Sequence, residues 1–150
     1  MAKLTNEECV RQYAAASAAH DARALAALRH PDWMVIWPQS GERVHGTGNW
    51  SEIIANYPGG APVTEITRIV GAEDRWVVTP GNTVIQIAGS GDFWTSEWRL
   101  TYPNGDVYLV VDLLELRDGL VHRETVYWAS PFEAPAWRAP WVEPVSDRGA

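Results

Sequence analysis

Two periodicities follow one another along this chain, and their order limits the folds that it can adopt. Apolar residues recur at helical spacing up to residue 29, whereas from residue 64 onward short apolar stretches alternate with turn sequences. Strands that are joined by tight turns favour antiparallel pairing. Because the helices precede the run of strands instead of alternating with them, the chain is predicted to form an α+β domain.

Residues 5–29 predict two helices. Thr5 and Glu8 have the spacing of a capping box, in which each side chain satisfies a backbone donor of the other residue. A break is expected just before Asp21, whose side chain can cap a second short helix. That helix should end before Pro31, because the residue in front of a proline avoids the helical region.

The rest of the chain is predicted to be mostly sheet. Helices should cover one face of a curved antiparallel sheet and leave a cone-shaped barrel with an internal pocket. A loop or hairpin is expected over 39–48. A third short helix is expected over 49–57, and strands over 33–37, 64–70, 76–78, 83–88, 95–102, 107–116 and 120–128.

The chain of 150 residues is expected to form a single domain, 1–150, with residues 129–150 as an extended C-terminal strap. The strap holds four prolines together with Phe132, Trp137 and Trp141. These aromatic residues predict that the strap packs on the body of the protein.

Composition excludes several classes of protein. Twelve Lys and Arg against nineteen Asp and Glu give a net charge of −7, which does not suit nucleic-acid binding. We expect no membrane span and no secretory signal, since neither apolar pattern is visible. A lone cysteine cannot form a disulfide within the chain and so does not require an oxidising compartment. A cytoplasmic location is therefore expected. Nine Trp residues predict a large aromatic pocket or a large buried interface.

Both faces of the strand expected over 107–116 are apolar. A solvated face of an antiparallel sheet is normally polar, so a second buried surface is implied. The simplest account is a homodimer through the outer face of the sheet, with Trp94, Trp98 and Tyr102 as candidate contacts.

Several known site types are missing from the sequence. It contains no phosphate-binding loop, no dinucleotide glycine fingerprint and no nucleophile elbow. The four histidines are scattered, with no pair at helical spacing, so no metal site is predicted. No cofactor is expected either.

Asp112 is the most informative polar residue, because aliphatic residues surround it. By strand alternation it shares a face with Val110 and Leu114. If that face lines the cavity, desolvation would raise the pKa of Asp112, and the protonated carboxyl could donate a hydrogen bond to an oxyanion. The alternative is an outward-facing Asp112 in a dimer contact or paired with an arginine.

Glu97, Glu124 and Tyr13 complete the candidate catalytic set. Either glutamate would act as acid or base if it faces the cavity; the alternative is pairing with Arg99 or Arg123. Tyr13 lies on the apolar side of the first helix, where the alternative is a core aromatic residue. The expected substrate-binding residues are Val35, Trp37, Tyr57, Val110, Leu114, Val126 and Trp128.

Two stretches resemble a known superfamily. They are 11–21, followed by Ala27-Leu28 before Pro31-Asp32, and 111–121, followed by Val126-Tyr127-Trp128. They look like the opening helices and the last hairpin of nuclear transport factor 2-like domains. That superfamily includes the SnoaL-like cyclases, ketosteroid isomerase, limonene epoxide hydrolase and scytalone dehydratase. The resemblance spans Thr5 to Trp128 and is specific for the fold, which hosts many chemistries.

The resemblance also implies roles for single residues. Tyr13 and Asp112 match the oxyanion-hole tyrosine and the protonated aspartic acid of ketosteroid isomerase, which is the standard example of a carboxyl kept neutral by an apolar site. The base aspartate of that enzyme precedes a proline, and Trp37 stands there, before Pro38. The last-strand aspartate of limonene epoxide hydrolase falls on Val126.

The resemblance therefore implies a cofactor-independent enzyme with acid–base and oxyanion-stabilising chemistry. It would act as an isomerase, cyclase, dehydratase or hydratase on a small hydrophobic or aromatic molecule. The alternative is a non-catalytic, dimeric protein of the same fold that binds a small ligand.

Overall fold

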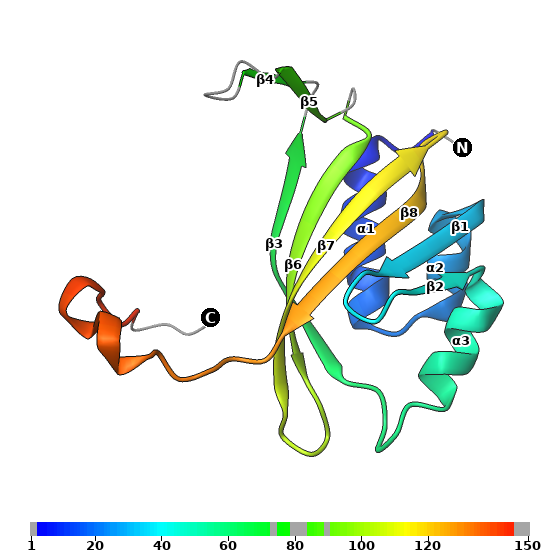
Figure 1. Ribbon diagram of the computed structural model, residues 1–150. Coiled ribbons are helices and arrows are strands. Elements are labelled where there is room, and N and C mark those ends of the chain that lie inside the picture. Colours follow the sequence, from blue (N-terminus) through cyan, green and yellow to red (C-terminus); the bar gives the residue numbers. More distant parts are fainter. Residues whose placement is uncertain (1–2, 73–74, 79–83, 89–90, 146–150) are drawn as a thin grey trace.

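The computed structural model describes residues 3–72, 75–78, 84–88 and 91–145, and Figure 1 shows their arrangement. The helices are α1 (Asn6–Ala18), α2 (Ala22–Leu28) and α3 (Thr47–Ala55). The main sheet contains β1 (Arg29–Trp37), β2 (Glu42–His45), β3 (Val63–Ala72), β6 (Phe93–Thr101), β7 (Val107–Arg117) and β8 (Leu120–Ala129). Strands β4 (Arg75–Val78) and β5 (Val84–Ala88) form a separate hairpin, and a short 3₁₀ helix, η1 (Ala136–Trp141), lies in the C-terminal segment.

Both N-terminal helices begin at the residues that the sequence indicates. The Thr5 hydroxyl accepts a bond from the Glu8 backbone N–H, and the Glu8 carboxylate accepts one from the Thr5 backbone N–H at 2.8 Å. The capping box is therefore confirmed. Asp21 accepts bonds from the first backbone N–H groups of α2. Between the helices, His20 adopts a left-handed conformation with φ of 53°, which turns the chain.

The strand order of the main sheet is β2-β1-β8-β7-β6-β3. Four of its five pairings are antiparallel, but β1 runs parallel to β8. The prediction of an antiparallel sheet is wrong at this one pairing. Parallel neighbours need a long connection, and here residues 38–119, more than half of the chain, lie between the two strands. In the segment expected as a loop or hairpin, β2 pairs with the end of β1 as a hairpin, and α3 begins at Thr47.

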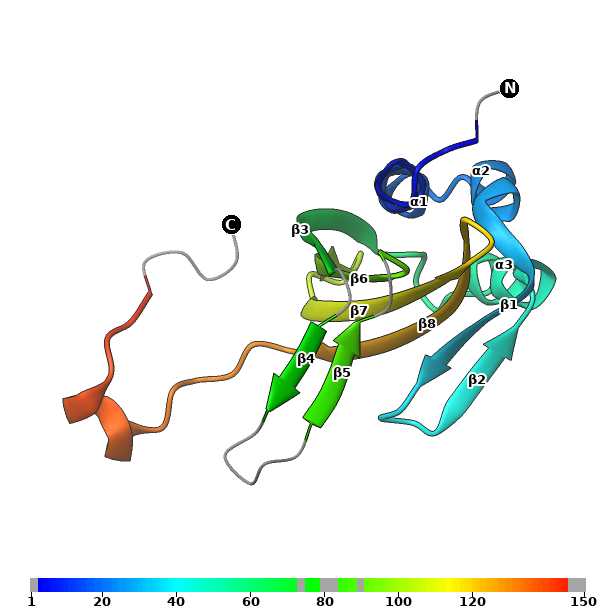
Figure 2. The ribbon, with the colours of Figure 1, turned by 90° about the horizontal axis from the view of Figure 1, so that it is seen from above.

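Side chains alternate across the sheet as strand geometry requires. On β7, Val110, Asp112 and Leu114 are buried, whereas Leu109 and Val111 are exposed on the outer face. Figure 2 shows that α1 and α2 lie over one face of the curved sheet, which we call the inner face. The α+β prediction is confirmed, with the qualification that the curved sheet stays open.

The expected dimer contacts lie on the wrong face for that role. Trp94 and Trp98 pack against the hydrophobic core, and Trp98 and Tyr102 line the internal cavity. The assignment failed because the tryptophans of β6 face inward. The outer face of β6 carries Glu97 and Arg99, which are more polar than Trp94 and Trp98.

The core lies between the inner face and the helices. Its largest fully buried side chains are those of Tyr13 and Trp33. Thr83 and residues 89–90, which the sequence placed in a strand and a turn, lie outside the described residues. No helix in the described part of the chain is long and apolar enough to cross a membrane.

The C-terminal segment leaves the end of β8 and extends away from the body (Figure 1). We call residues 130–145 the C-terminal arm. Its aromatic residues Phe132, Trp137 and Trp141 are 74%, 72% and 78% exposed. The arm does not pack on the body of this chain as expected, because it leaves the end of β8 and extends outward.

Candidate functional site

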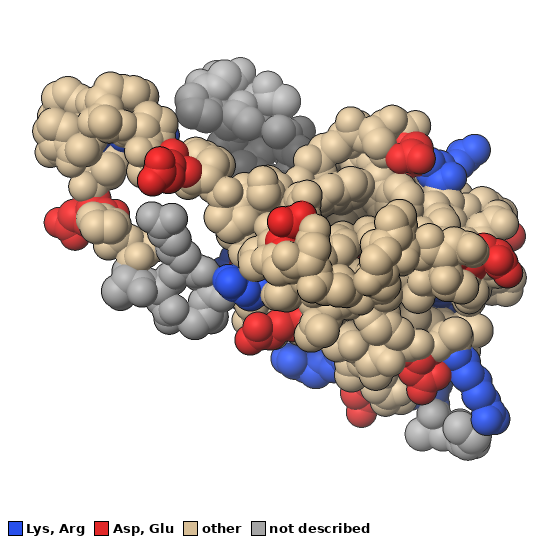
Figure 3. All heavy atoms as spheres, turned by 90° about the horizontal axis from the view of Figure 1, so that it is seen from below, with Lys and Arg blue, Asp and Glu red and all other residues tan. Residues whose placement is uncertain are grey.

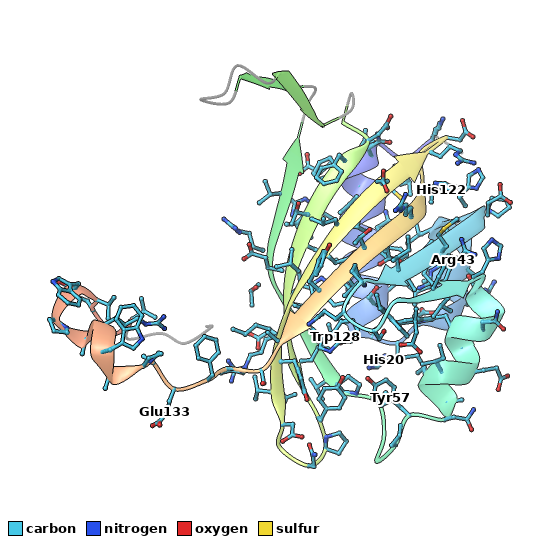
Figure 4. The ribbon with its side chains drawn as sticks, in the orientation of Figure 1. His20, Arg43, Tyr57, His122, Trp128 and Glu133 are labelled. Carbon is cyan, nitrogen blue, oxygen red and sulfur yellow. The ribbon has the colours of Figure 1, made fainter. Side chains whose placement is uncertain are left out.

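A cavity of about 410 Å³ lies between the inner face of the sheet and the helices. Its walls come from α1, α2 and α3 on one side and from strands of the main sheet on the other. Figure 3 views the molecule from the end that carries the β6–β7 turn. Charged residues cover only a small part of the surface in view. Figure 4 shows His20 and Tyr57 near this end, between the sheet and α3.

Tryptophan rings form much of the wall. The Trp37 ring lies 6.2 Å from that of Trp50 and 6.0 Å from that of Trp128, and Trp50 also contacts Trp33 at 6.2 Å between ring centroids. These edge-to-face and tilted pairs are favourable aromatic geometries. All four of these Trp residues line the cavity.

Glu124 is the buried acidic group of this cavity. It projects from β8 to the inner face and is only 4% exposed. Its Oε1 atom accepts a hydrogen bond from the Tyr13 hydroxyl at 2.5 Å and another from the Trp33 indole N–H at 2.7 Å. Burial of a carboxylate is costly unless donors compensate for lost water, and these two donors do so. Glu124 is among the residues that line the cavity.

Arg29 lies beside this carboxylate. Its Nε atom donates to the Tyr13 hydroxyl oxygen at 2.8 Å, and its guanidinium carbon lies 3.5 Å from the centroid of the Trp33 ring. Arg29 is 6% exposed, and its buried Nη1 atom has no hydrogen-bond partner among the described residues. A guanidinium stacked on an indole face gains cation–π stabilisation, which offsets part of its desolvation.

Tyr13 connects these two charges. Its hydroxyl donates its single hydrogen to Glu124 and accepts from Arg29. Burial raises the pKa of Tyr13 well above its ordinary value, and the negative charge of Glu124 raises it further. Tyr13 therefore stays protonated. With this one hydrogen engaged by Glu124, it is not free to donate to a ligand in the manner that the resemblance implies.

Asp112 lies behind this network, fully buried on β7. In the β7–β8 register Asp112 faces Val126 and Leu114 faces Glu124, so the two carboxyl groups are diagonal neighbours on the inner face. Neither Asp112 oxygen has a hydrogen-bond partner in the described part of the chain. Burial raises the pKa of Asp112 well above its ordinary value, and the nearby Glu124 raises it further. Both causes favour a protonated Asp112.

Two of the expected catalytic residues are not at the cavity wall. Asp112 is buried beneath it, so it does not face a ligand directly. Glu97 lies on the outer face of β6, where it pairs with Arg68, so the expectation that it faces the cavity is wrong. Strand parity explains this, because Glu97 alternates with the inward-facing Ser96 and Trp98.

Most of the expected substrate-binding residues do line the cavity. Six of them are in its wall: Val35, Trp37, Tyr57, Val110, Val126 and Trp128. Leu114 is the exception. It lies deeper, in the hydrophobic core, and is 1% exposed.

Sequence reasoning missed Arg29, Trp33 and Trp50. The strand expected over 33–37 begins at Arg29, but alternation does not place the guanidinium, because Pro31 has the same parity and is exposed, and the β1–β8 register shifts between Arg29 and Met34. Among the described residues, no group of three His, Cys, Asp or Glu side chains could hold a metal ion.

Comparisons with known proteins agree with this architecture. Residues 10–124 match the family model of the SnoaL-like domain. None of the curated proteins compared with the chain matches it. Among solved structures, an NTF-2 like protein of unknown function from Burkholderia xenovorans LB400 is 32% identical. The match covers 94% of this chain and 95% of that one, with a TM-score of 0.72.

Two further solved structures have names that refer to an activity. A putative ketosteroid isomerase from Kribbella flavida DSM 17836 is 24% identical, with a TM-score of 0.72; the match covers 95% of this chain and 91% of that one. A putative polyketide cyclase from Pseudomonas putida KT2440 is 20% identical, with a TM-score of 0.60, covering 84% of this chain and 92% of that one. At these identities the likeness shows the fold alone.

Proposed function

The chain belongs to the SnoaL-like domain family, and on that premise we propose that it is a cofactor-independent enzyme that moves a proton on a small hydrophobic or aromatic molecule. The reaction class is isomerisation, cyclisation, dehydration or hydration. One observation carries the proposal: a single buried carboxyl, Glu124, is held at the wall of an aromatic cavity with the Arg29 guanidinium nearby.

Glu124 is the proposed base. It takes a proton from a carbon next to a carbonyl group, and the electron pair of the broken C–H bond moves onto the carbonyl oxygen. The enolate that results is reprotonated at another atom in an isomerisation, or attacks a second carbonyl in a cyclisation. The donors on Oε1 from Tyr13 and Trp33 hold the carboxylate in one orientation. A positioned base of this kind contributes on the order of 10²–10⁴ in rate.

Arg29 is the proposed partner of the developing oxyanion. It lines the cavity and carries a permanent positive charge. Fixed charge aimed at the atom where negative charge develops is a strong form of catalysis in a site that excludes water. Tyr13 then acts through Glu124 and Arg29 as a positioning residue, in place of the direct oxyanion donor that the resemblance implies.

Asp112 is proposed as a second positioning residue. A protonated Asp112 diagonal to Glu124 adds no second negative charge to the pair. Two ionised carboxyl groups this close would repel each other, and one of them would take up a proton. Asp112 thereby leaves the negative charge on Glu124, at the cavity wall.

The test is exchange of carbon-bound hydrogen for deuterium. The protein would be incubated in D₂O with a panel of aromatic ketones and β-keto esters, and deuterium uptake next to the carbonyl would be followed by NMR. Exchange faster than in buffer for at least one compound is the expected result. Ligand binding, seen as quenching of Trp fluorescence, without any exchange across the panel would contradict the enzyme proposal.

A binding protein of the same fold is the second candidate. It is favoured by the hydrogen bonds between Tyr13, Glu124 and Arg29, which satisfy Oε1 and the tyrosine hydroxyl within the chain. A pocket whose polar groups are already paired can hold an apolar molecule between its Trp rings without reacting with it.

We propose further that the protein is a single domain that forms a homodimer through the outer face of the sheet. Leu109, Val111 and Tyr127 are 43%, 40% and 45% exposed on adjacent strands, which makes a contiguous apolar surface. The C-terminal arm supplies additional apolar area. Its aromatic side chains would pack on the second copy instead of on their own chain.

A further inference from the structure

A second polar position lies in the same cavity, away from Glu124. The hydroxyl groups of Tyr57 and Tyr102 are 2.8 Å apart, and both residues line the cavity. Tyr57 follows α3, and Tyr102 follows β6, so the pair joins the helical side of the cavity to the sheet. We propose that this tyrosine pair is a subsite that binds a hydroxyl or carbonyl oxygen at the far end of an elongated, otherwise apolar ligand.

The hydrogen count of the pair supports a role in binding. Two hydroxyl groups carry two hydrogens, and their mutual bond uses one of them. The second hydrogen remains available to an acceptor in the cavity. Burial and the hydrogen bond shared with Tyr57 raise the pKa of Tyr102, so its hydroxyl stays protonated and neutral. A neutral donor suits a neutral hydroxyl or carbonyl oxygen.

The surroundings hold the pair in place. The Tyr102 backbone N–H donates to the Asp106 carbonyl at 2.8 Å, and the Tyr102 carbonyl accepts from Gly105 at 2.9 Å, which fixes it in the β6–β7 turn. The Tyr102 ring also contacts the Tyr108 ring edge-to-face at 5.4 Å, and it lies 5.6 Å from the Tyr57 ring. A site on a turn with this many contacts loses little entropy when it binds.

The distance to Glu124 determines the ligand shape. Tyr108, which contacts Tyr102, and Leu114, which pairs with Glu124, are six positions apart on β7, or about 20 Å of strand. That length is measured along the strand between backbone positions. An elongated molecule can therefore reach both polar positions at once, with tryptophan rings along its length. This inference rests on the proposed function, since it takes Glu124 as the reacting end.

Matched probes can separate the two ends. We would measure the affinities of trans-stilbene, 4-hydroxystilbene and 4,4′-dihydroxystilbene by isothermal titration, for the wild type and for Tyr57→Phe, Tyr102→Phe and Tyr127→Phe. Tyr127 lies on the outer face, so its variant is the control. The second hydroxyl should tighten binding to the wild type and to the control by about three- to tenfold, as expected for one added hydrogen bond.

The gain from the second hydroxyl should fall in Tyr57→Phe and in Tyr102→Phe, because each variant removes one of the two hydroxyl groups and leaves the other without the partner that orients its hydrogen. Three results would overturn the subsite. They are an unchanged gain in affinity in both variants, equal affinities of the wild type for the two hydroxylated probes, and no binding of any stilbene. None of these readouts requires turnover. A normal stilbene series without deuterium exchange would leave the subsite in place and contradict only the enzyme proposal.

Discussion

The Tyr13 hydroxyl donates to Oε1 of Glu124 at 2.5 Å, which joins the first helix to the last strand across 111 positions of sequence. This bond changes the role that sequence resemblance assigns to Tyr13. A tyrosine whose one hydrogen is already engaged by a carboxylate cannot donate it to a ligand at the same time. In the proposed mechanism, Glu124 is therefore the reactive carboxyl and Tyr13 is a positioning residue.

Replacing Tyr13 with Phe should destabilise the protein by about 1–3 kcal/mol, because it leaves the buried Nε of Arg29 without its acceptor and removes one of two donors from Glu124. Urea unfolding measures the difference. Tyr127→Phe on the outer face is the matched control and should change the free energy of unfolding by much less. Equal effects of the two substitutions would show that the buried network contributes nothing to stability.

Replacing Asp112 with Asn should change how stability depends on pH. The pKa of Asp112 is raised in the folded state, whereas an aspartate in the unfolded chain titrates near about 4. Above that pH the folded wild type binds more protons than the unfolded chain, so the wild type loses stability as pH rises toward the folded-state pKa. Asp112→Asn lacks this loss.

The free energy of unfolding would be measured for both proteins by urea titration across this range of pH. The stability of Asp112→Asn relative to the wild type should rise with pH from about 4 upward. Glu133→Gln on the exposed arm is the control and should follow the wild type (Figure 4). A difference between Asp112→Asn and the wild type that stays constant with pH would mean that Asp112 does not hold a raised pKa.

Replacing Arg29 with Met should lower the turnover of the best exchange substrate by about 10²–10³-fold, since it removes the charge proposed to face the oxyanion and keeps an apolar stem against Trp33. The rate constant kcat and the Michaelis constant would be measured separately. The exposed Arg43 on β2 offers a control, Arg43→Met, which should leave both unchanged. Turnover in Arg29→Met equal to that of the wild type would exclude the oxyanion role.

Replacing Val111 with Glu should convert the proposed dimer to a monomer, because it places a charge in the centre of the outer apolar face. Light scattering after size-exclusion chromatography reports the mass. Leu4→Glu, on the chain that leads into α1, is a control that should leave the dimer intact. A wild-type mass of one chain at micromolar concentration would refute the dimer.

The sequence predicts most of the fold because local patterns specify it. The capping box at Thr5, the cap at Asp21 and the alternation along β7 each depend on neighbours in the chain. The parallel β1–β8 pairing depends on contacts between distant segments, and no local pattern reports it. The same pairing is what brings Arg29 and Trp33 next to Glu124.

The inner face was harder to assign than the strands themselves. On β7 the alternation shows that Asp112 shares a face with Val110 and Leu114, but both faces of this strand are apolar, so the sequence leaves open which face is buried. On β6 both faces carry large residues, so the sequence pattern alone does not decide whether Trp98 or Glu97 faces inward. The position of the C-terminal arm could not be predicted, because its exposed aromatic residues suggest packing without saying on which chain.

The most direct measurement compares two glutamate variants in the deuterium-exchange assay. Glu124→Gln removes the proposed base but keeps an oxygen that can accept from Tyr13 and Trp33, whereas Glu97→Gln changes a carboxylate on the outer face. The exchange rate should fall by about 10²–10⁴-fold in Glu124→Gln and stay at the wild-type value in Glu97→Gln. An exchange rate in Glu124→Gln that equals the wild-type rate would contradict the account of this site.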